Sequence, residues 1–248
     1  MDVRLWGPSG WKLLHTIAHH YKATPESKEN AEVFFCNLKH ILPCIYCRES
    51  LTGYIDDLPI APYLGSSRQL QKWVYKIHNK VNAKLRKQGE NSRPDPAFGE
   101  VIKQYDDASK SLCRDMPGWD FLFSIAFNYP NKPGEITEDK RTQHIIFFEK
   151  LVELLPDCDY KEKFARFIGK SPVFPALKNR GALKRWMYKL YKFVHCQSNT
   201  SPSFNKVCDR YEFFRAGCAK KGFRGRTCRK SLASLKMTKK QAMRLIRI

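Results

Sequence analysis

The sequence lacks three features, and each absence narrows the class of protein. No window approaches the roughly 20 consecutive apolar residues that a transmembrane helix needs. Residues 1–21 contain no continuous apolar run, so no signal peptide is expected. No segment alternates β-branched and polar residues in the way that predicts a strand. The sequence therefore predicts an all-α protein with neither a membrane span nor a secretion signal.

Acidic residues are also scarce, above all near the C-terminus. The 248-residue chain has 24 Asp and Glu against 45 Lys and Arg, which gives a formal net charge of +21. Residues 213–248 contain no acidic residue and hold twelve of the Lys and Arg. Such a tail would bind a polyanion such as nucleic acid, anionic lipid or an acidic protein surface. The alternative is a solvated basic face that keeps the protein soluble.

Apolar residues and cysteines, in contrast, are plentiful. The apolar content of 42% and the aromatic content of 13% are sufficient for packed cores, in one large domain or two small ones. Nine cysteines are many for a reduced intracellular protein, and they are too dispersed for a small secreted scaffold. The combination is expected of a protein that handles disulfides inside a cell.

Apolar residues recur at helical spacing through the first half of the chain. Residues 6–10 (Trp-Gly-Pro-Ser-Gly) are typical of a turn, and Ser9 is the expected N-cap of the helix that follows. The spacing predicts helices over residues 11–21, 26–41, 44–55, 68–87 and 96–105. We expect these helices to form one domain over residues 1–110.

The pattern of the first half recurs weakly beyond about residue 112. Three segments line up: residues 119–129 with 11–21, residues 154–156 with 41–43, and Trp186 with Trp73. An inserted loop near residues 131–138 would absorb the one difference in spacing. A chance similarity between two apolar helical patterns is the alternative to a true repeat.

The second half lacks the polar groups that the first half carries at matching positions. Phe123 replaces His15, Tyr191 replaces His78, and Asp157 and Tyr160 stand where Cys44 and Cys47 stood. We therefore predict a degenerate helical copy over residues 111–200, which keeps the core and has lost a reactive site. Residues 201–248 are predicted to be a basic, cysteine-containing tail.

The reactive site is expected at Cys44 and Cys47, which follow Pro43 and fall in the first turn of a predicted helix. Unsatisfied backbone N–H groups and the positive end of the helix dipole favour a thiolate there. By itself, a Cys-x-x-Cys pair could be half of a zinc site, a thioredoxin-like redox pair, or two buried thiols. A thioredoxin-like pair would need a βαβ context, which this helical chain does not offer.

A zinc site would need two further ligands at close spacing. The chain has no second Cys-x-x-Cys, although four histidines lie in this part of the sequence: His15, His19, His20 and His40. We therefore predict no bound metal.

Three ordered motifs decide between these explanations. They are Trp-x3-His-x2-Ala-x2-Tyr over residues 11–21, Pro-Cys-x-x-Cys over 43–47, and His-Asn-x-Val-Asn over 78–82. Together they resemble the Erv/ALR family of FAD-linked sulfhydryl oxidases over roughly residues 5–106. The resemblance implies a four-helix bundle with a short fifth helix, and an isoalloxazine ring at the bundle mouth beside the two cysteines.

The resemblance also implies which residues form the site. Trp11 and His15 lie one helical turn apart and could line a flat ring, while His78 and Asn82 share the face of another helix. Lys84 and Lys87 would meet the FAD pyrophosphate. The implied catalytic residues are Cys44 and Cys47, and the implied cofactor-binding residues are Gly7, Trp11, His15, Tyr21, His78, Asn79, Val81, Asn82, Lys84, Lys87 and Tyr105.

The chain departs from cellular members of the family in one region. Those members commonly carry cysteines that bracket the fourth helix, and this chain has none there. Phe98 and Tyr105 are the expected substitutes for an aromatic residue that cellular members often carry in the fifth helix.

The reaction implied by the resemblance is disulfide formation in protein substrates. A substrate dithiol reduces the Cys44–Cys47 disulfide through a mixed disulfide. By this resemblance Cys44 is the exposed, attacked sulfur and Cys47 lies against the flavin. The flavin passes the electrons to molecular oxygen, which yields hydrogen peroxide.

The arrangement resembles most closely the sulfhydryl oxidases of large DNA viruses, of the mimivirus type. This implies a role in virion disulfides, in the host cytoplasm (the viral factory) or in the virion. The second domain would be an interaction module, in a homodimer or as an internal pseudo-dimer. The competing interpretation is a cysteine-stapled, nucleic-acid-binding structural protein that works through its tail.

The remaining cysteines are less informative. Cys36 follows the apolar Phe35 and is expected to be a packed thiol. The tail cysteines could form a structural bridge or a mobile disulfide that relays electrons to Cys44. The pairing stays open for six cysteines: Cys113, Cys158, Cys196, Cys208, Cys218 and Cys228.

Overall fold

The computed structural model describes residues 1–89, 93–109, 113, 115–195 and 201–215, and all regular elements in these residues are helical. The α-helices are α1 (Val3–His20), α2 (Pro25–Ile41), α3 (Ile45–Asp57), α4 (Ser67–Lys87), α5 (Phe98–Ser109), α6 (Trp119–Asn128), α7 (Glu138–Leu154), α8 (Asp159–Lys170), α9 (Arg180–Val194) and α10 (Phe204–Phe214). Short 3-10 helices are η1 (Ala61–Tyr63), η3 (Pro133–Glu135) and η4 (Phe174–Lys178). The predicted all-α fold is confirmed. Among the described helices, none combines the length and apolarity that a membrane crossing requires.

The start of α1 differs from the prediction. Residues 6–10 are not a turn but part of the helix, which begins at Val3 and runs through Pro8. Asp2 is the N-cap, because its carboxylate accepts a hydrogen bond from Arg4 N at 2.9 Å. Ser9 does not cap α1 but accepts a hydrogen bond from Phe121 N in the first turn of α6, at 3.4 Å. The composition of residues 6–10 predicts a turn, but the cap at Asp2 and the contact of Ser9 with α6 stabilise a helix there instead.

The other helices of the first half begin and end near their predicted limits. The Thr24 and Ser66 side chains cap α2 and α4 by accepting hydrogen bonds from Ser27 N and Gln69 N. The fifth helix, predicted over residues 96–105, runs from Phe98 to Ser109.

Two buried side chains hold the connection between α3 and α4 in the first half. The Trp73 indole on α4 donates to Leu58 O at the end of α3, at 2.9 Å. The Tyr21 hydroxyl, just after α1, donates to Leu64 O at 3.0 Å. Since both bonds satisfy backbone carbonyls outside the helices, they hold the connection between α3 and α4 against the core.

The second half repeats these two bonds at matching positions. Trp186 on α9 donates to Ser171 O at 2.8 Å, and Tyr129 after α6 donates to Leu177 O at 2.9 Å. The helices α6, α7, α8 and α9 therefore hold the places that α1, α2, α3 and α4 hold in the first half. The weak sequence repeat corresponds to a repeat of specific contacts.

The repeat extends to the fifth helix. The Tyr75 hydroxyl donates to Pro96 O at 2.9 Å and its ring packs against Phe98, with centroids 5.2 Å apart. In the second half Tyr188 donates to Pro202 O at 3.0 Å and packs against Phe204, again at 5.2 Å. Helix α10 therefore stands where α5 stands, although the sequence pattern places residues 201–215 in the tail.

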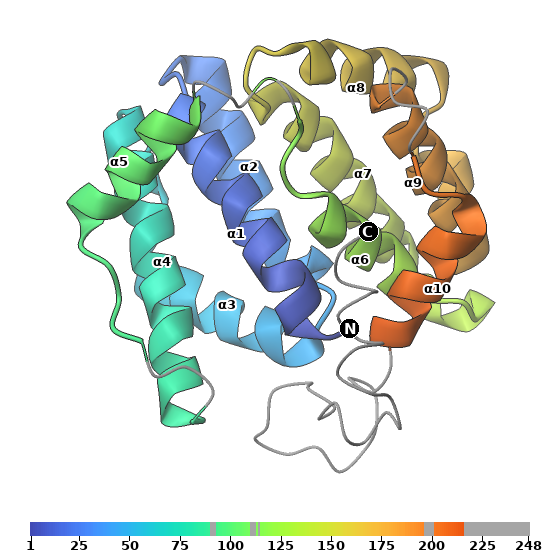
Figure 1. The fold of residues 1–248 in the computed structure, drawn as a ribbon, viewed down its shortest axis with the longest axis horizontal. Helices are drawn as coiled ribbons and strands as arrows, with labels where there is room; N and C mark the ends of the chain where they lie inside the picture. Colours follow the sequence, from blue (N-terminus) through green and yellow to red (C-terminus); the bar gives the residue numbers. More distant parts are fainter. Residues whose placement is uncertain (90–92, 110–112, 114, 196–200, 216–248) are drawn as a thin grey trace.

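The two halves lie side by side, with α4 and α5 on one side of α1 and α8, α9 and α10 on the other (Figure 1). Helix α1 packs along α6 and α2 packs along α7, so equivalent helices face each other. Buried side chains of both halves join in a single continuous core.

The contacts between α1 and α6 are reciprocal. A Cβ atom added to Gly10 would lie 3.3 Å from Phe121 Cγ, and one added to Gly118 would lie 2.8 Å from Leu13 Cδ2. Gly118 is the counterpart of Gly10, and Phe121 is the counterpart of Leu13. Each glycine thus admits the large side chain of the facing helix. Reciprocal contacts of this kind are the mark of a two-fold interface.

The contacts between α2 and α7 show the same reciprocity. Asn37 Nδ2 donates to Gln143 O, and Lys150 Nζ donates to Asn30 Oδ1, both at 2.7 Å. Lys150 is the counterpart of Asn37, and Gln143 is the counterpart of Asn30. The contacts between the two halves thus occur in matching pairs, which is the pattern that a two-fold arrangement produces.

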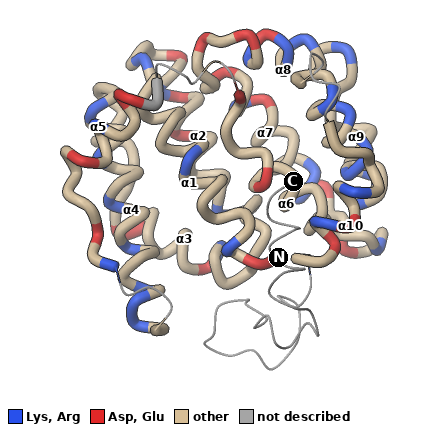
Figure 2. The backbone as a smooth tube through the Cα atoms, viewed as in Figure 1, with Lys and Arg blue, Asp and Glu red and all other residues tan. Residues whose placement is uncertain are grey.

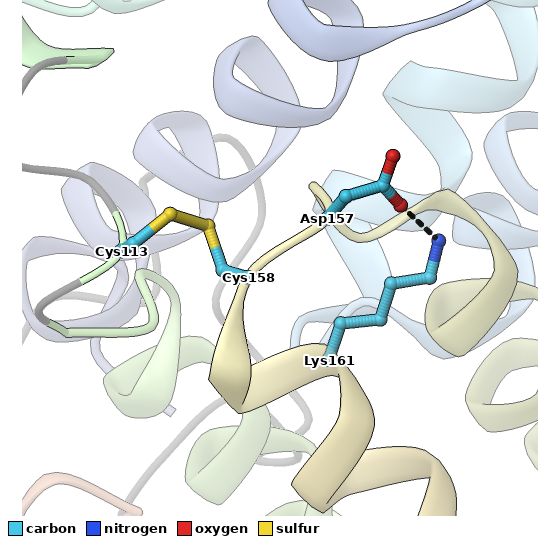
Figure 3. Close-up of a disulfide and its surroundings, with 4 residues drawn as sticks. All are labelled: Cys113, Asp157, Cys158 and Lys161. Carbon is cyan, nitrogen blue, oxygen red and sulfur yellow. Dashed lines mark hydrogen bonds and ion pairs between the residues drawn. A yellow bond between two sulfur atoms is a disulfide. The ribbon is translucent and has the colours of Figure 1, made fainter.

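One disulfide joins the connection between the halves to the second half. Cys113, between α5 and α6, is bonded to Cys158, the N-cap of α8 (Figure 3). Beside it, Asp157 accepts a hydrogen bond from Lys161 at 3.1 Å. Cys208 is half-buried on α10 and is not in a disulfide. Cys196, Cys218 and Cys228 lie outside the described residues.

Basic side chains also gather outside the tail. Figure 2 shows Lys and Arg along α9, and residues 174–195 hold six of them without a single acidic residue. The part of the basic tail beyond residue 215, and with it the predicted polyanion contact, lies outside the described residues.

Candidate active site

The two cysteines lie where α2 ends and α3 begins. Cys44 is the N-cap of α3 in an extended conformation, and Cys47 N donates to Cys44 O at 3.1 Å. No side chain of the described residues caps this helix, so the first-turn N–H groups and the helix dipole act on the two sulfurs. Both cysteines therefore stand at the positive end of a helix, as the sequence analysis predicts.

The exposure of the two residues is the reverse of the expectation. Cys44 is only 2% exposed, whereas Cys47 is half-buried. Cys44 follows the buried Pro43 and has an extended backbone, and it is itself buried at the start of α3 rather than on the surface. The expectation that Cys44 presents an exposed sulfur is therefore wrong for this conformation.

A cavity of about 220 Å³ lies beside the cysteines, between α1, α2, α3 and α4. Both Cys44 and Cys47 line it, and most of the remaining wall is aromatic or aliphatic. Among the described lining residues, Lys84 is the one that carries a charge, and its ammonium donates to Ser50 Oγ at 2.5 Å. Flat cofactors bind in enclosed apolar spaces with a few polar groups of this kind.

Two buried polar atoms on residues that line the cavity have no hydrogen-bond partner in the described part of the chain. They are Trp6 Nε1 and Gln88 Oε1. Because an unpaired buried polar atom costs free energy, these atoms mark where a ligand could pair with the protein. The sequence analysis missed both residues, because Trp6 falls in a segment typical of a turn and Gln88 belongs to no motif.

A cluster of aromatic and imidazole rings lies on α1, α4 and α5. His15 Nε2 and His78 Nδ1 are 3.1 Å apart, and the His78 ring stacks on Trp11 with centroids 4.0 Å apart. Burial, together with the nearby His78, lowers the pKa of His15 to about 3, and burial lowers that of His78 to about 4. Both imidazoles are therefore neutral at pH 7, and one donates to the other.

Helix α5 completes this cluster. Tyr105 stacks on His15, with centroids 5.1 Å apart and an interplanar angle of 21°. Burial raises the pKa of the Tyr105 hydroxyl to about 12. The predicted residues Trp11, His15, His78 and Tyr105 are thus brought together, from three separate segments of the sequence.

Asn82 is held by the loop that leads to α5. Its amide donates to Asp95 Oδ1 at 2.8 Å, and Asp95 also accepts two hydrogen bonds from Arg86, at 2.9 and 2.7 Å. The Arg86 guanidinium holds the pKa of the Asp95 carboxyl below its usual range. The sequence analysis named Asn82 but not Asp95 or Arg86, because their pairing depends on how the loop folds back onto α4.

The other predicted residues differ in their relation to the cavity. Gly7 and Val81 line it, as do Trp11 and Lys84. Asn79 is half-buried on α4, and Lys87 is exposed near its end. Tyr21 does not line the cavity, and its bond to Leu64 O, repeated at Tyr129, gives it a part in the fold.

The described residues of the second half lack a counterpart of the Cys44–Cys47 pair. Tyr160 stands at the position aligned with Cys47 and is 4% exposed, and Phe164 stands at that of Leu51. Burial raises the pKa of Tyr160 to about 12. Helix α8 begins one residue later in the alignment than α3, so that its N-cap is Cys158 rather than Asp157. Larger side chains and a disulfide thus replace the reactive pair.

Comparison with known proteins places the chain in a family. The Erv1 / Alr family profile matches residues 8–105. The chain is 40% identical over 88 residues to the mitochondrial FAD-linked sulfhydryl oxidase ERV1 of Saccharomyces cerevisiae, covering 35% of this chain and 46% of the relative. It is 36% identical over 84 residues to the FAD-linked sulfhydryl oxidase of African swine fever virus, covering 33% of this chain and 69% of the relative.

A third relative comes from another large virus. It is named "Probable FAD-linked sulfhydryl oxidase R368", of Acanthamoeba polyphaga mimivirus, and is 35% identical over 85 residues, 33% of this chain and 59% of the relative. No solved structure matches the chain. The chain belongs to the Erv1/Alr family, which confirms the resemblance seen in its motifs. It spans about half the length of the yeast relative and more than half of the two viral ones.

Proposed function

We propose that this protein is an FAD-dependent sulfhydryl oxidase that forms disulfides in protein dithiols. Molecular oxygen accepts the two electrons and becomes hydrogen peroxide. The observation that carries the proposal is the apolar cavity that has both Cys44 and Cys47 in its wall. The names of the relatives point the same way.

The residues present suit FAD. The cavity offers an apolar enclosure with two unpaired polar atoms, at Trp6 and Gln88, and one cation at Lys84. The neutral His15–His78 pair and Tyr105 offer rings and hydrogen-bonding groups for the rest of the cofactor. When bound, FAD supplies a two-electron acceptor that can be reoxidised by oxygen.

The chain's own part in the reaction is thiol–disulfide exchange. A substrate thiolate attacks one sulfur of the Cys44–Cys47 disulfide, and a mixed disulfide forms as the S–S bond breaks. The second substrate thiolate then attacks this mixed disulfide. The substrate leaves oxidised, and Cys44 and Cys47 are left as a thiol and a thiolate.

Helix α3 favours this exchange through its first turn. Its N–H groups and dipole stabilise the leaving thiolate, whichever of the two cysteines carries it. With Cys44 only 2% exposed, a substrate that attacks this sulfur must first displace the residues that cover it. We therefore expect local opening around the start of α3 when substrate binds.

The second half takes the place of a partner subunit in this proposal. The reciprocal contacts of α1 with α6 and of α2 with α7 support an internal pseudo-dimer rather than a homodimer through the same face. Gel filtration with light scattering tests this point. A dimer that separates when α6 is altered at the α1 contact would contradict it.

Protein dithiols are the proposed substrates, and the large-virus relatives support a role in disulfide formation for virion proteins. The proposed setting is the host cytoplasm (the viral factory) or the virion.

The visible absorption spectrum of the purified protein tests the proposed function. We expect flavin bands that stay with the protein on filtration and are released on denaturation, and oxygen consumption that depends on dithiothreitol. A colourless protein that consumes no oxygen with thiols would overturn the proposal. If that protein also bound DNA at physiological salt, the nucleic-acid-binding interpretation would replace it.

A further inference from the structure

Phe121 belongs to the second half, yet it lines the cavity of the first half. Among the described lining residues it is the one contributed from beyond residue 110. It enters from α6 over Gly10 of α1, where an added Cβ would lie 3.3 Å from the Phe121 ring. That distance is tighter than an ordinary van der Waals contact, so a glycine at this position favours the close approach of the ring. The wall of the cavity is therefore incomplete without the second half.

The Phe121 ring also packs on Trp6, the residue with the unpaired indole nitrogen. The two ring centroids are 5.8 Å apart with an interplanar angle of 33°, and Trp6 is 6% exposed. Its Nε1 has no hydrogen-bond partner in the described part of the chain. The N–H group of a buried tryptophan usually has a hydrogen-bond partner. Because the described residues supply none for Trp6, packing contacts such as the one with Phe121 must hold its ring in place.

The internal repeat explains how a residue of the second half reaches this place. Leu13, the counterpart of Phe121, makes the matching contact in the other direction, against Gly118. On that side the larger Tyr160 and Phe164 stand in place of Cys47 and Leu51. Buried Tyr160 and Phe164 thus occupy, in the second half, the positions that Cys47 and Leu51 hold in the cavity wall of the first half.

We propose that Phe121 is a positioning residue for the flavin site, acting through Trp6. It closes one wall of the cavity and holds the Trp6 indole so that its N–H is available to a hydrogen-bond acceptor of the bound flavin. The second half, which has lost its own site, is in this way required for cofactor binding by the first. The inference rests on the proposed function, because it takes the cavity to be the flavin site.

The test compares FAD binding by full-length variants, measured by titrating the cofactor-free protein and following flavin fluorescence. Phe121→Leu keeps an apolar side chain but shortens it, and we expect FAD binding to weaken five- to tenfold. Trp6→Phe removes the indole N–H together with part of the ring, and we expect about a tenfold loss together with a shifted flavin absorption band. In the double variant the losses are expected not to add, because both changes act through Trp6.

Phe148→Leu is the matched control. Phe148 is fully buried on α7 and packs on Trp186, with centroids 5.0 Å apart, but it does not line the cavity. We expect this variant to melt at a lower temperature and to bind FAD as the wild type does. If Phe148→Leu weakened FAD binding as much as Phe121→Leu, the role of Phe121 would be one of general stability, and the inference would be overturned.

Two further outcomes are decisive. If Phe121→Leu fails to fold, Gly10→Ala replaces it, since the added methyl displaces the Phe121 ring from the other side and is expected to weaken FAD binding in the same way. If every variant binds FAD as tightly as the wild type does, the inference is overturned and the proposed function stands. A wild-type protein that binds no FAD overturns the proposed function and the inference with it.

Discussion

Phe34 of α2 stacks on Phe147 of α7, its own counterpart in the second half, with ring centroids 5.5 Å apart and an interplanar angle of 21°. A residue that meets its own counterpart lies on the axis of a two-fold arrangement. Gly10 with Phe121, and Gly118 with Leu13, flank this axis as a reciprocal pair. The faces of α1 and α2 that make these contacts are therefore covered by α6 and α7 of the same chain.

Acidification is expected to destabilise the cofactor-free protein through His15 and His78. Their pKa values, about 3 and about 4, lie below the value near 6.5 of an unfolded chain, so the unfolded state binds protons first as the pH falls. The stabilising contribution is complete above pH 6.5 and is lost as the pH falls toward 4. For His78 alone the loss amounts to about 3 kcal/mol.

Urea unfolding of the wild type and of His78→Asn between pH 7.5 and 4 measures this effect. The difference in unfolding free energy between the two proteins should shift in favour of the variant as the pH falls. His144, whose pKa is lowered to about 4 chiefly by burial, is present in both proteins and cancels in the comparison. A pH-independent difference would show that His78 titrates normally in the folded state.

The Cys113–Cys158 disulfide is expected to be a major source of stability. It closes a loop with a sequence separation of 45 residues, for which chain entropy gives about 4 kcal/mol. Cys158→Ser should therefore lower the unfolding free energy by about that amount in buffer without reductant. Cys208→Ser, which removes a half-buried thiol outside any disulfide, is the control and should cost much less. Equal stability of Cys158→Ser and wild type would contradict the assignment.

Asp95 is expected to fasten the loop before α5 to α4. Asp95→Asn removes the charge that pairs with Arg86 and should lower the melting temperature at pH 7. Because the folded-state pKa of Asp95 lies below its usual value, this stabilisation is present above about pH 4 and is lost as the pH falls through the folded pKa. The difference in melting temperature between the wild type and Asp95→Asn should therefore disappear in strong acid. Asp57→Asn, at an exposed pair with Lys80, should have little effect at any pH.

Much of the first half could be predicted from the sequence. Apolar spacing is a local signal, and it predicts α2, α3 and α4 to within a few residues. The ordered motifs correctly predict that Trp11, His15 and His78 lie together, because each motif is itself a local pattern.

The remaining features depend on contacts between distant segments. The run Trp-Gly-Pro-Ser-Gly has the composition of a turn, yet α1 passes through it because Asp2 caps the helix and bonds through its backbone to Phe214 O. Spacing alone cannot choose among the pairings of six cysteines, so it does not predict the Cys113–Cys158 bond. Phe121 lines the cavity because the two halves pack together, and no local sequence pattern predicts that packing.

Oxygen consumption by Cys47→Ser tests the central claim most directly. With dithiothreitol as the reductant, we expect the wild type to consume oxygen and release hydrogen peroxide, and Cys36→Ser, a half-buried thiol on α2, to behave like it. Cys47→Ser should be purified as a yellow, FAD-loaded protein with no thiol-dependent oxygen consumption, because the cavity is kept and the reactive pair is broken. Normal oxygen consumption by a yellow Cys47→Ser protein would contradict the account.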